Sequence, residues 1–178
     1  MAKERLRLVR PAAAYEEQVM AYRDEMLKNG DSLDGCAGLE TVDSFSEWMD
    51  FERRLKAQYK EGYVPSDVFL AVRQADDVLV GMIDLRHQLS PFLRRSGGNI
   101  GYSVRPAERR KGYATEMLRL LLPLCRASGK ERVLVTCDRE NEASRKTILQ
   151  NGGILADEVE DTAGLSRCGI LQRYWIEV

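Results

Sequence analysis

Three consecutive cations, Arg109, Arg110 and Lys111, stand directly before Gly112 in the stretch VRPAERRKGYATEM (104–117). An apolar helical pattern begins immediately afterwards, so these cations lie at a helix start, where the backbone dipole disfavours them. The first N–H groups of a helix have no partners within it, and a glycine lets a ligand approach them without meeting a Cβ atom. The arrangement indicates a cradle for an anion such as phosphate. A solvated basic turn with an ordinary loop glycine explains the local sequence equally well.

Other chemistries receive less support from the residue types present. Neither G-x-x-x-x-G-K-[ST] nor G-x-G-x-x-G occurs, which weakens two common nucleotide-binding interpretations. The cysteines are too widely separated for a zinc or redox motif, so we expect reduced structural thiols at Cys36, Cys125, Cys137 and Cys168. His87 is the only histidine, so any Cys/His or Ser/His dyad depends on it. We expect no metal site.

The composition predicts one compact domain over residues 1–178, because 44% hydrophobic content suits a substantial core. The formal charge is −1, with 27 basic and 28 acidic residues, which argues against general affinity for nucleic acid or anionic membrane. No apolar run is long enough to span a bilayer, and the first residues contain no apolar signal core. We expect a cytoplasmic protein, as a monomer or homodimer.

The N-terminal part is predicted to contain a strand, RLRLVRP, followed by two helices. The first helix has apolar and aromatic residues at helical spacing over 15–26 and ends at Asn29-Gly30. An acidic, glycine-rich loop follows at 30–40, and the second helix is indicated over 45–59. These elements would cover one side of a sheet.

The middle and C-terminal parts alternate between strands and helices. DVFLAVR, DVLVGMIDLRHQL and GGNIGYSVR are β-rich runs typical of an antiparallel meander. A helix over 114–125 ends at Gly129, with Pro123 expected to kink or loosen it, and ERVLVTC then forms a buried strand. Asn141 caps the helix in NEASRKTILQNGG, and strands such as RYWIEV complete the chain. The order predicts a mixed α+β protein.

The stretch around the cations resembles the GCN5-related N-acetyltransferase (GNAT) family. The central signature of that family, [QR]-x-x-G-x-[GA], is matched by Arg109, Gly112 and Ala114. The wider pattern V-x-P-x-x-R-x-x-G is matched by Val104 and Pro106. The predicted strand before the motif and the helix after it are the context that the family requires.

A second element of the resemblance lies downstream, where N-x-x-[SA] is matched by Asn141 and Ser144. The resemblance covers residues 99–154, about a third of the chain. It implies a single-domain acyl-CoA N-acyltransferase (GNAT-like) fold of the α+β class. Its twisted, mixed but mostly antiparallel sheet would have helices on both faces and would splay open at the strand that holds the cofactor.

The resemblance also implies acetyl-CoA as the acyl donor. The backbone amides of 110–115 would bind its pyrophosphate, the strand at 102–104 would hydrogen-bond its pantetheine arm, and the downstream element would lie near the thioester. Phosphate charge could be offset by Arg109, Lys111, Arg145 or Lys146, although for Arg145 and Lys146 a solvated helix face is the simpler explanation. The implied cofactor-binding residues are Tyr102, Ser103, Val104, Arg109, Arg110, Lys111, Gly112, Tyr113, Ala114, Thr115, Asn141 and Ser144.

Two positions depart from the catalytic pattern that similar enzymes use. In those enzymes an acceptor amine attacks the thioester directly, which requires a proton acceptor for the amine and a proton donor for the leaving thiolate. Many relatives have a tyrosine as the donor at the position of Ile148, and some have a glutamate as the base near the position of Gly98. This chain supplies neither group there.

The replacement candidates for catalysis are Asp84 and His87. Their odd spacing places them on opposite faces of a regular strand, so without a bulge only one of them could serve. Tyr102 and Tyr174 could relay a proton, and a water molecule could replace all four side chains.

The acceptor is an amine whose identity the sequence leaves open: a peptide N-terminus, a lysine, a polyamine, an aminoglycoside or a small metabolite. The acidic stretches at 31–50 and 157–161 could attract a cationic amine, although exposed acidic loops are common without a ligand. An acetyl-CoA-dependent N-acetyltransferase is the main hypothesis, and a catalytically silent coenzyme A-binding sensor or structural protein is the alternative. The charge balance disfavours a nucleic-acid binder.

Overall fold

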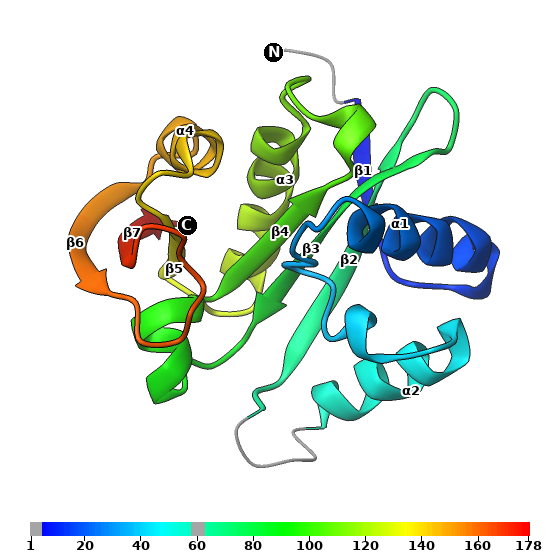
Figure 1. The fold of residues 1–178 in the computed structure, drawn as a ribbon, viewed down its shortest axis with the longest axis horizontal. Helices are drawn as coiled ribbons and strands as arrows, with labels where there is room; N and C mark the ends of the chain where they lie inside the picture. The colour runs from blue at the N-terminus through cyan, green and yellow to red at the C-terminus, as the bar shows by residue number, and fades with distance from the viewer. Residues whose placement is uncertain (1–4, 58–62) are drawn as a thin grey trace.

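The computed structural model describes residues 5–57 and 63–178. Its strands form two antiparallel sheets, with the orders β1-β2-β3-β4 and β5-β7-β6 (Figure 1). The strands are β1 (Leu6–Val9), β2 (Ser66–Arg73), β3 (Leu79–Arg86), β4 (Ile100–Val104), β5 (Arg132–Asp138), β6 (Ile154–Glu160) and β7 (Ile170–Glu177). The predicted α+β class and the antiparallel meander of β2, β3 and β4 are confirmed.

The helices are α1 (Glu16–Lys28), α2 (Phe45–Lys56), α3 (Tyr113–Ala127) and α4 (Glu142–Gln150). Each corresponds to a predicted helix, although the predicted end of the second helix, at Tyr59, lies outside the described residues. Ser44 caps α2, since its hydroxyl accepts from the Glu47 amide, and the Glu47 carboxylate accepts from the amide of Asp43, just before the cap. Within the part of the chain that is described, no helix has the length and apolar character needed to cross a bilayer.

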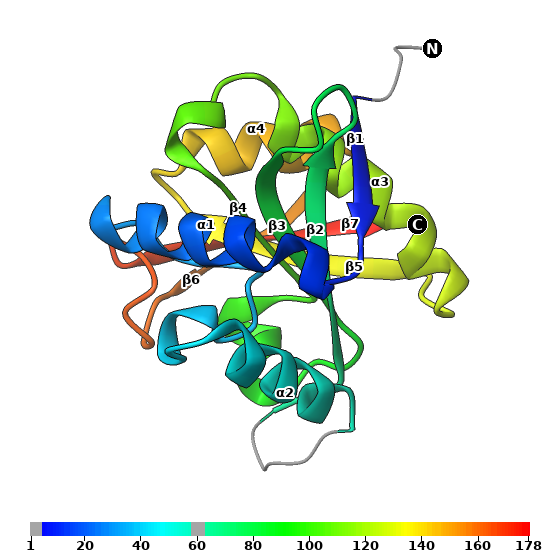
Figure 2. The same ribbon diagram turned by 90° about the vertical axis from the view of Figure 1, so that its right-hand side faces the viewer.

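The first sheet is covered by helices on both faces, as predicted. Alternate residues of β2 point to opposite sides: Phe69 and Ala71 pack with α3, whereas Leu70 and Val72 pack with α1 and α2. Figure 2 shows α1 and α2 on one face of this sheet and α3 on the other. Each face of the sheet has its own hydrophobic core, and their largest fully buried side chains include Met117 on the α3 side and Trp48 on the side of α1 and α2. β4 is therefore held between two packed layers.

α3 continues without interruption through Pro123 to Ala127, so the expected early loosening does not occur. Pro123 is exposed to solvent, while the opposite stripe of α3, which includes Met117 and Leu121, is completely buried. Packing of that stripe against the sheet compensates for the hydrogen bond that a proline removes.

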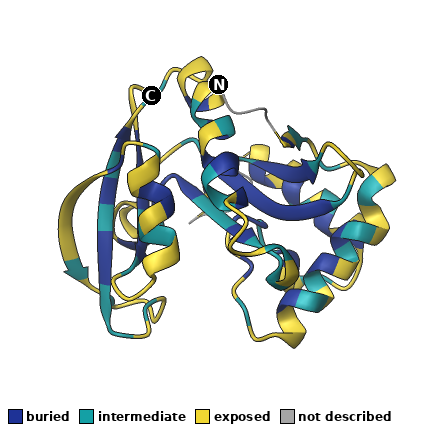
Figure 3. Cartoon of the chain, turned by 90° about the horizontal axis from the view of Figure 1, so that it is seen from above, coloured by how far each residue is buried: buried dark blue, intermediate teal, exposed yellow. Residues whose placement is uncertain are grey.

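The two sheets share one hydrophobic core and are linked by hydrogen bonds between Asn99 and Leu134. The Asn99 amide donates to the Leu134 carbonyl at 2.7 Å, and the Leu134 amide donates to the Asn99 side-chain oxygen at 2.9 Å. Gly98 has a φ of 66°, and a Cβ added there would lie 2.6 Å from the Leu134 carbonyl oxygen. Past this junction β4 and β5 belong to different sheets, as the view from above shows (Figure 3). The predicted opening at β4 is thus present.

Candidate active site

The turn before α3 presents a row of unbonded amides. Arg110 and Gly112 have φ values of 62° and 79°, in the left-handed region, and this turns the chain sharply into the helix. Among the described residues, none accepts a hydrogen bond from the amides of 110–115, and the first bonded amide is that of Glu116, which donates to the Gly112 carbonyl. These free N–H groups lie at the positive end of a 15-residue helix, which favours a bound anion.

Arg5 and Glu116 hold this turn in place. The Arg5 guanidinium donates to the Lys111 carbonyl and to the Glu116 carboxylate, each at 3.0 Å, and lies 4.7 Å from the centre of the Tyr113 ring. Burial opposes ionisation of Glu116, but hydrogen bonds from the amides of Leu6 and Arg5 outweigh it and lower the pKa of Glu116. Sequence patterns did not reveal this pair because its members are separated by 111 positions.

Most of the basic side chains near the turn are already paired. Arg109 contacts Asp31 at 2.5 Å, and Lys111 contacts Glu108 at 2.9 Å. The Arg110 guanidinium has no such partner within the described ranges. Phosphate charge at this turn would therefore be met by the backbone and Arg110 more than by Arg109 and Lys111.

The start of α4 faces the same region. The Asn141 side chain accepts from the Ser144 amide at 3.0 Å, so the predicted cap is confirmed and that side-chain oxygen is occupied. Arg145 and Lys146 lie 3.6 and 3.5 Å from Glu142 on the exposed face of the helix. Their placement agrees with the simpler, solvated interpretation.

One edge of β4 is open toward α4. The Val104 carbonyl accepts from the Arg109 guanidinium at 3.0 Å, so it points away from β3. Backbone direction alternates along a strand, so Tyr102 also presents its backbone to this open edge, whereas Ser103 faces β3. The Ser103 hydroxyl is bonded to the Asp34 carbonyl and to Tyr22, on the side of α1. Ser103, unlike its neighbours, does not line the open edge.

Two hydroxyls meet between β4 and α4. The Tyr102 oxygen lies 2.7 Å from the Ser144 hydroxyl oxygen. Burial raises the pKa of Tyr102, and the charge of Asp34 raises it further, so this phenol stays protonated in neutral solution. Ile148 is completely buried, and its side chain lies 2.3 Å from where a Cβ of Gly153 would be, so it belongs to the core beneath α4.

The loop between α1 and α2 lies on the other face of β4. A Cβ added to Gly35 would lie 2.5 Å from the Gly101 carbonyl oxygen, so the loop backbone is packed directly on the strand. Trp48 of α2 holds this loop in place, because its indole N–H donates to the Cys36 carbonyl at 2.8 Å. Asp34 is exposed at this contact, within the acidic stretch that the sequence singled out.

Asp84 and His87 lie in different surroundings. Asp84 is 3% exposed and accepts from the Gly101 amide at 2.8 Å and from Arg86 at 3.1 Å. Burial raises the pKa of Asp84 although Arg86 opposes the effect. His87, just past the end of β3, lies 2.8 Å from the Asp67 carboxylate. The structure does not bring these two candidates together.

Tyr174, a possible proton relay, and the cysteines lie largely in the core. Tyr174 is 2% exposed and donates to the Gln172 side chain at 2.7 Å inside the core. The cysteines are free, and three of them are buried. Over residues 5–57 and 63–178 there is no group of three or more His, Cys, Asp or Glu side chains that could hold a metal ion.

The sequence matches the acetyltransferase (GNAT) domain model over residues 5–154. The chain belongs to the GNAT family. Among curated proteins, none matches the sequence of this GNAT protein significantly.

Solved GNAT structures share the fold. The Microcin C7 self immunity acetyltransferase MccE, in complex with acetyl-CoA and AMP, has a TM-score of 0.70 at 17% identity over 99% of this chain and 94% of that chain. RimL, a ribosomal L7/L12 alpha-N-protein acetyltransferase in complex with coenzyme A, also has a TM-score of 0.70 at 17% identity, over 100% of this chain and 97% of that chain. Mycobacterium smegmatis RimJ in complex with CoA-disulfide has a TM-score of 0.71 at 18% identity, over 97% of this chain and 82% of that chain. At these identities the likeness shows the fold.

The geometry of this GNAT protein combines three features at β4. A row of free amides at the start of α3 is suited to phosphate, an open strand edge is suited to an extended amide-containing arm, and a hydroxyl pair is suited to moving a proton. An exposed carboxylate, Asp34, lies across the strand from the hydroxyls.

Proposed function

We propose that this GNAT protein transfers an acetyl group from acetyl-CoA to an amine by direct attack in a ternary complex. The observation that carries the proposal is the row of unbonded amides at 110–115, next to the open edge of β4. Acetyl-CoA is the acyl donor that fits, because it joins a pyrophosphate to a pantetheine arm whose amides can pair with a strand. The structures of MccE and yncA contain acetyl-CoA.

The donor would lie along β4 from the turn toward α4. Its pyrophosphate would accept from the amides of 110–115, and Arg110 would add positive charge beside it. The pantetheine amides would pair with the backbone of Tyr102 and Val104 at the open edge. The thioester would then reach the hydroxyls of Tyr102 and Ser144.

The reaction requires two proton movements. The amine nitrogen attacks the thioester carbon, the C–S bond breaks, and the leaving sulfur takes up a proton as the nitrogen loses one. The hydroxyl pair of Tyr102 and Ser144, whose oxygens lie 2.7 Å apart, would donate to the sulfur, since both hydroxyls are protonated in neutral solution. This pair would do the work of the tyrosine that Ile148 replaces.

Asp34, whose carboxylate is exposed and accepts from the Ser32 hydroxyl, would meet the acceptor. Tyr102 and Ser103 point to opposite faces of β4, and Asp34 belongs to the loop that packs on the face of Ser103. An ammonium held by Asp34 would approach the thioester from the side opposite α3. Asp84 has no comparable opening, because it is buried and already has two donors.

Amine-dependent thiol release from acetyl-CoA tests the proposal. The panel should include a peptide with a free N-terminal serine, a lysine side chain, a polyamine and an aminoglycoside. The peptide comes first because RimL is described as an alpha-N-protein acetyltransferase. We expect release that depends on at least one amine.

The absence of the usual tyrosine favours a second candidate, a catalytically silent coenzyme A-binding protein. Tight binding of coenzyme A without release for any amine would support that candidate. Absence of both binding and release would contradict both functions.

A further inference from the structure

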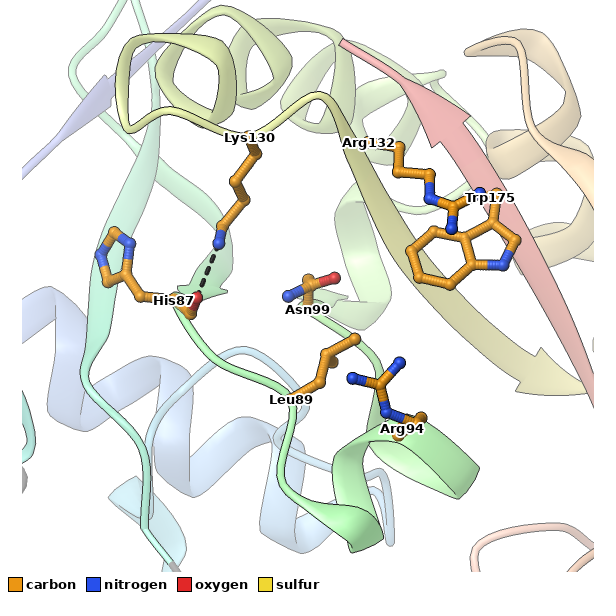
Figure 4. A pocket seen from close by; sticks show the side chains of 7 residues that line it. All are labelled: His87, Leu89, Arg94, Asn99, Lys130, Arg132 and Trp175. Atoms are coloured by element: carbon orange, nitrogen blue, oxygen red, sulfur yellow. Dashed lines mark hydrogen bonds between the residues drawn. The ribbon is translucent and has the colours of Figure 1, made fainter.

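A second concave site lies at the opposite end of α3 from the free amides. It has a volume of about 290 Å³ and is lined by His87, Leu89, Arg94, Asn99, Lys130, Arg132 and Trp175 (Figure 4). α3 spans about 22 Å between its ends, since each of its 15 residues adds 1.5 Å. The pocket is therefore separate from the proposed coenzyme site and has no part in the function proposed above.

The lining of this pocket is cationic and, within the described part of the chain, contains no carboxylate. Arg94, Lys130 and Arg132 contribute three positive charges, and the Lys130 ammonium donates to the His87 carbonyl at 2.7 Å. The nearest acid bonded to a lining residue is Asp67, which is held by His87 and Arg10. Like charges at a shared concave surface raise the local concentration of anions.

Arg132 is fixed in a position that leaves its donors free. Its guanidinium carbon lies 4.3 Å from the centre of the Trp175 ring, so the flat face of the group is covered. The N–H groups point outward in the plane of the guanidinium, and within the described residues none of them has an acceptor. Such a group matches phosphate or carboxylate in a two-bond geometry.

The Arg94 guanidinium also has no acceptor among the described residues, although the guanidinium groups of nearby arginines do. Arg95 donates to the Glu160 carbonyl at 2.9 Å, and Arg173 contacts Asp157 at 2.5 Å. Figure 4 shows the Arg94 side chain directed toward Asn99, into the pocket. The contrast with Arg95 indicates that Arg94 is not simply one more paired surface cation.

Two facts limit the argument to the arginines. Lys130 follows the C-terminus of α3, where a cation is favourable without any ligand. Glu177 lies opposite Arg132 in the β5–β7 register, yet the Arg132 side chain stacks on Trp175 and makes no ion pair with Glu177. The donors available to a ligand are those of Arg94 and Arg132.

We propose that this pocket binds a compact phosphate dianion, such as a phosphomonoester. Two guanidinium groups neutralise two charges and supply enough donors for the phosphate oxygens. The volume accommodates a phosphate with a small organic body, and the overall charge of −1 argues against an extended nucleic-acid surface.

The test titrates inorganic phosphate and glycerol 3-phosphate into the full chain saturated with coenzyme A, which keeps the free amides of α3 occupied. The chain has two tryptophans, so indole N–H signals in NMR spectra report two places. We expect a saturable shift of Trp175 and no shift of Trp48, which is buried and bonded to Cys36. Sodium chloride at matched ionic strength should not reproduce the shift.

The variants isolate the two arginines. Arg94→Ala should weaken binding at least about tenfold, and Arg132→Lys should also weaken it because charge is kept while the planar donors are lost. Arg95→Ala removes the same charge from the adjacent position and should bind as the parent does. Equal affinity for Arg94→Ala and the parent would overturn the proposal. The proposal would also be overturned if a short RNA bound more tightly than glycerol 3-phosphate. A Trp175 shift that appears without coenzyme A but not in its presence would overturn it as well.

Discussion

At the scale of single residues, Gly112 combines a left-handed φ of 79° with unusual space around it. Among the described residues other than its chain neighbours, a Cβ added there would approach within 4 Å only the Arg5 guanidinium, at 3.5 Å. The protein itself thus leaves this side of the turn open, and the conformation is one that residues with a Cβ adopt at a cost. Both features fit a turn shaped around a ligand.

Gly112→Val should weaken acetyl-CoA binding at least about tenfold, or roughly 1.4 kcal/mol. The added β-branched side chain would occupy the space where the phosphates approach and would disfavour the left-handed conformation. Calorimetric titration of the folded variant measures the change. Lys111→Ala is the matched control: it removes an exposed pair with Glu108, so its effect should be small and should shrink at high salt. Unchanged affinity for Gly112→Val would remove the basis of the proposed coenzyme site.

Asp34→Asn should lower turnover at least about tenfold, because an amide cannot pair with the ammonium as a carboxylate does or accept its proton. The KM for acetyl-CoA should stay near the parental value, since Asp34 lies across β4 from the coenzyme. Rates against pH with the best amine provide the measurement. Asp84→Asn and His87→Ala serve as comparisons, and a parental profile for Asp34→Asn beside an altered one for either of them would return the role to that residue.

At the scale of elements, Asp138 joins the end of β5 to two connecting segments. Its carboxylate accepts from the Glu140 amide at 2.7 Å, before α4, and from the Arg167 amide at 2.5 Å, between β6 and β7. Burial acts to raise its pKa, but these hydrogen bonds outweigh burial and lower the pKa of Asp138 to about 2. The orientation of α4, and with it Ser144, depends on this connection.

The lowered pKa predicts how stability changes with pH. Because the folded value lies below the ordinary 3.8, the stabilisation is complete above about pH 4 and is lost as pH falls toward 2. Asp138→Asn should therefore lower the Tm at pH 7, and its difference from the parent should shrink in acid. Thermal unfolding at several pH values measures this, with Glu17→Gln on the exposed face of α1 as control. A constant difference in Tm between pH 7 and pH 2 would contradict the prediction.

At the scale of the whole molecule, the two sheets share a hydrophobic core with α3, and polar contacts join them near the open edge of β4. The backbone link at Asn99 and Leu134 closes one end, and the Tyr102–Ser144 hydroxyl pair bridges the opening. A coenzyme lying along β4 would contact both halves, so binding should stabilise the folded state as a unit.

Coenzyme A at about one hundred times its Kd should therefore add about 2.7 kcal/mol to the free energy of unfolding. For a chain of this size that corresponds to a rise in Tm of roughly 5–10 °C. Differential scanning calorimetry measures the rise, and adenosine, which lacks the pyrophosphate and pantetheine, should produce almost none. An equal rise with adenosine would mean that the amides of 110–115 contribute little.

The sequence by itself determined the features that depend on neighbours a few positions away. Helical periodicity located α1, α2 and α3, and the basic turn at Gly112 marked the start of α3. The capping Asn141 and the Asn151-Gly152-Gly153 stop located α4. These features follow from local backbone bonding and side-chain spacing, so a linear pattern contains them.

Only the tertiary structure decided which distant groups meet. It gave Arg109 a partner in Asp31, joined Tyr102 to Ser144, buried Asp84 and placed His87 at the pocket beyond the far end of α3. These pairs are formed by packing of sheets and helices, and their members are far apart in the chain. A charge or hydroxyl in the sequence shows what chemistry is available, but its partners and exposure are set by the core that folds around it.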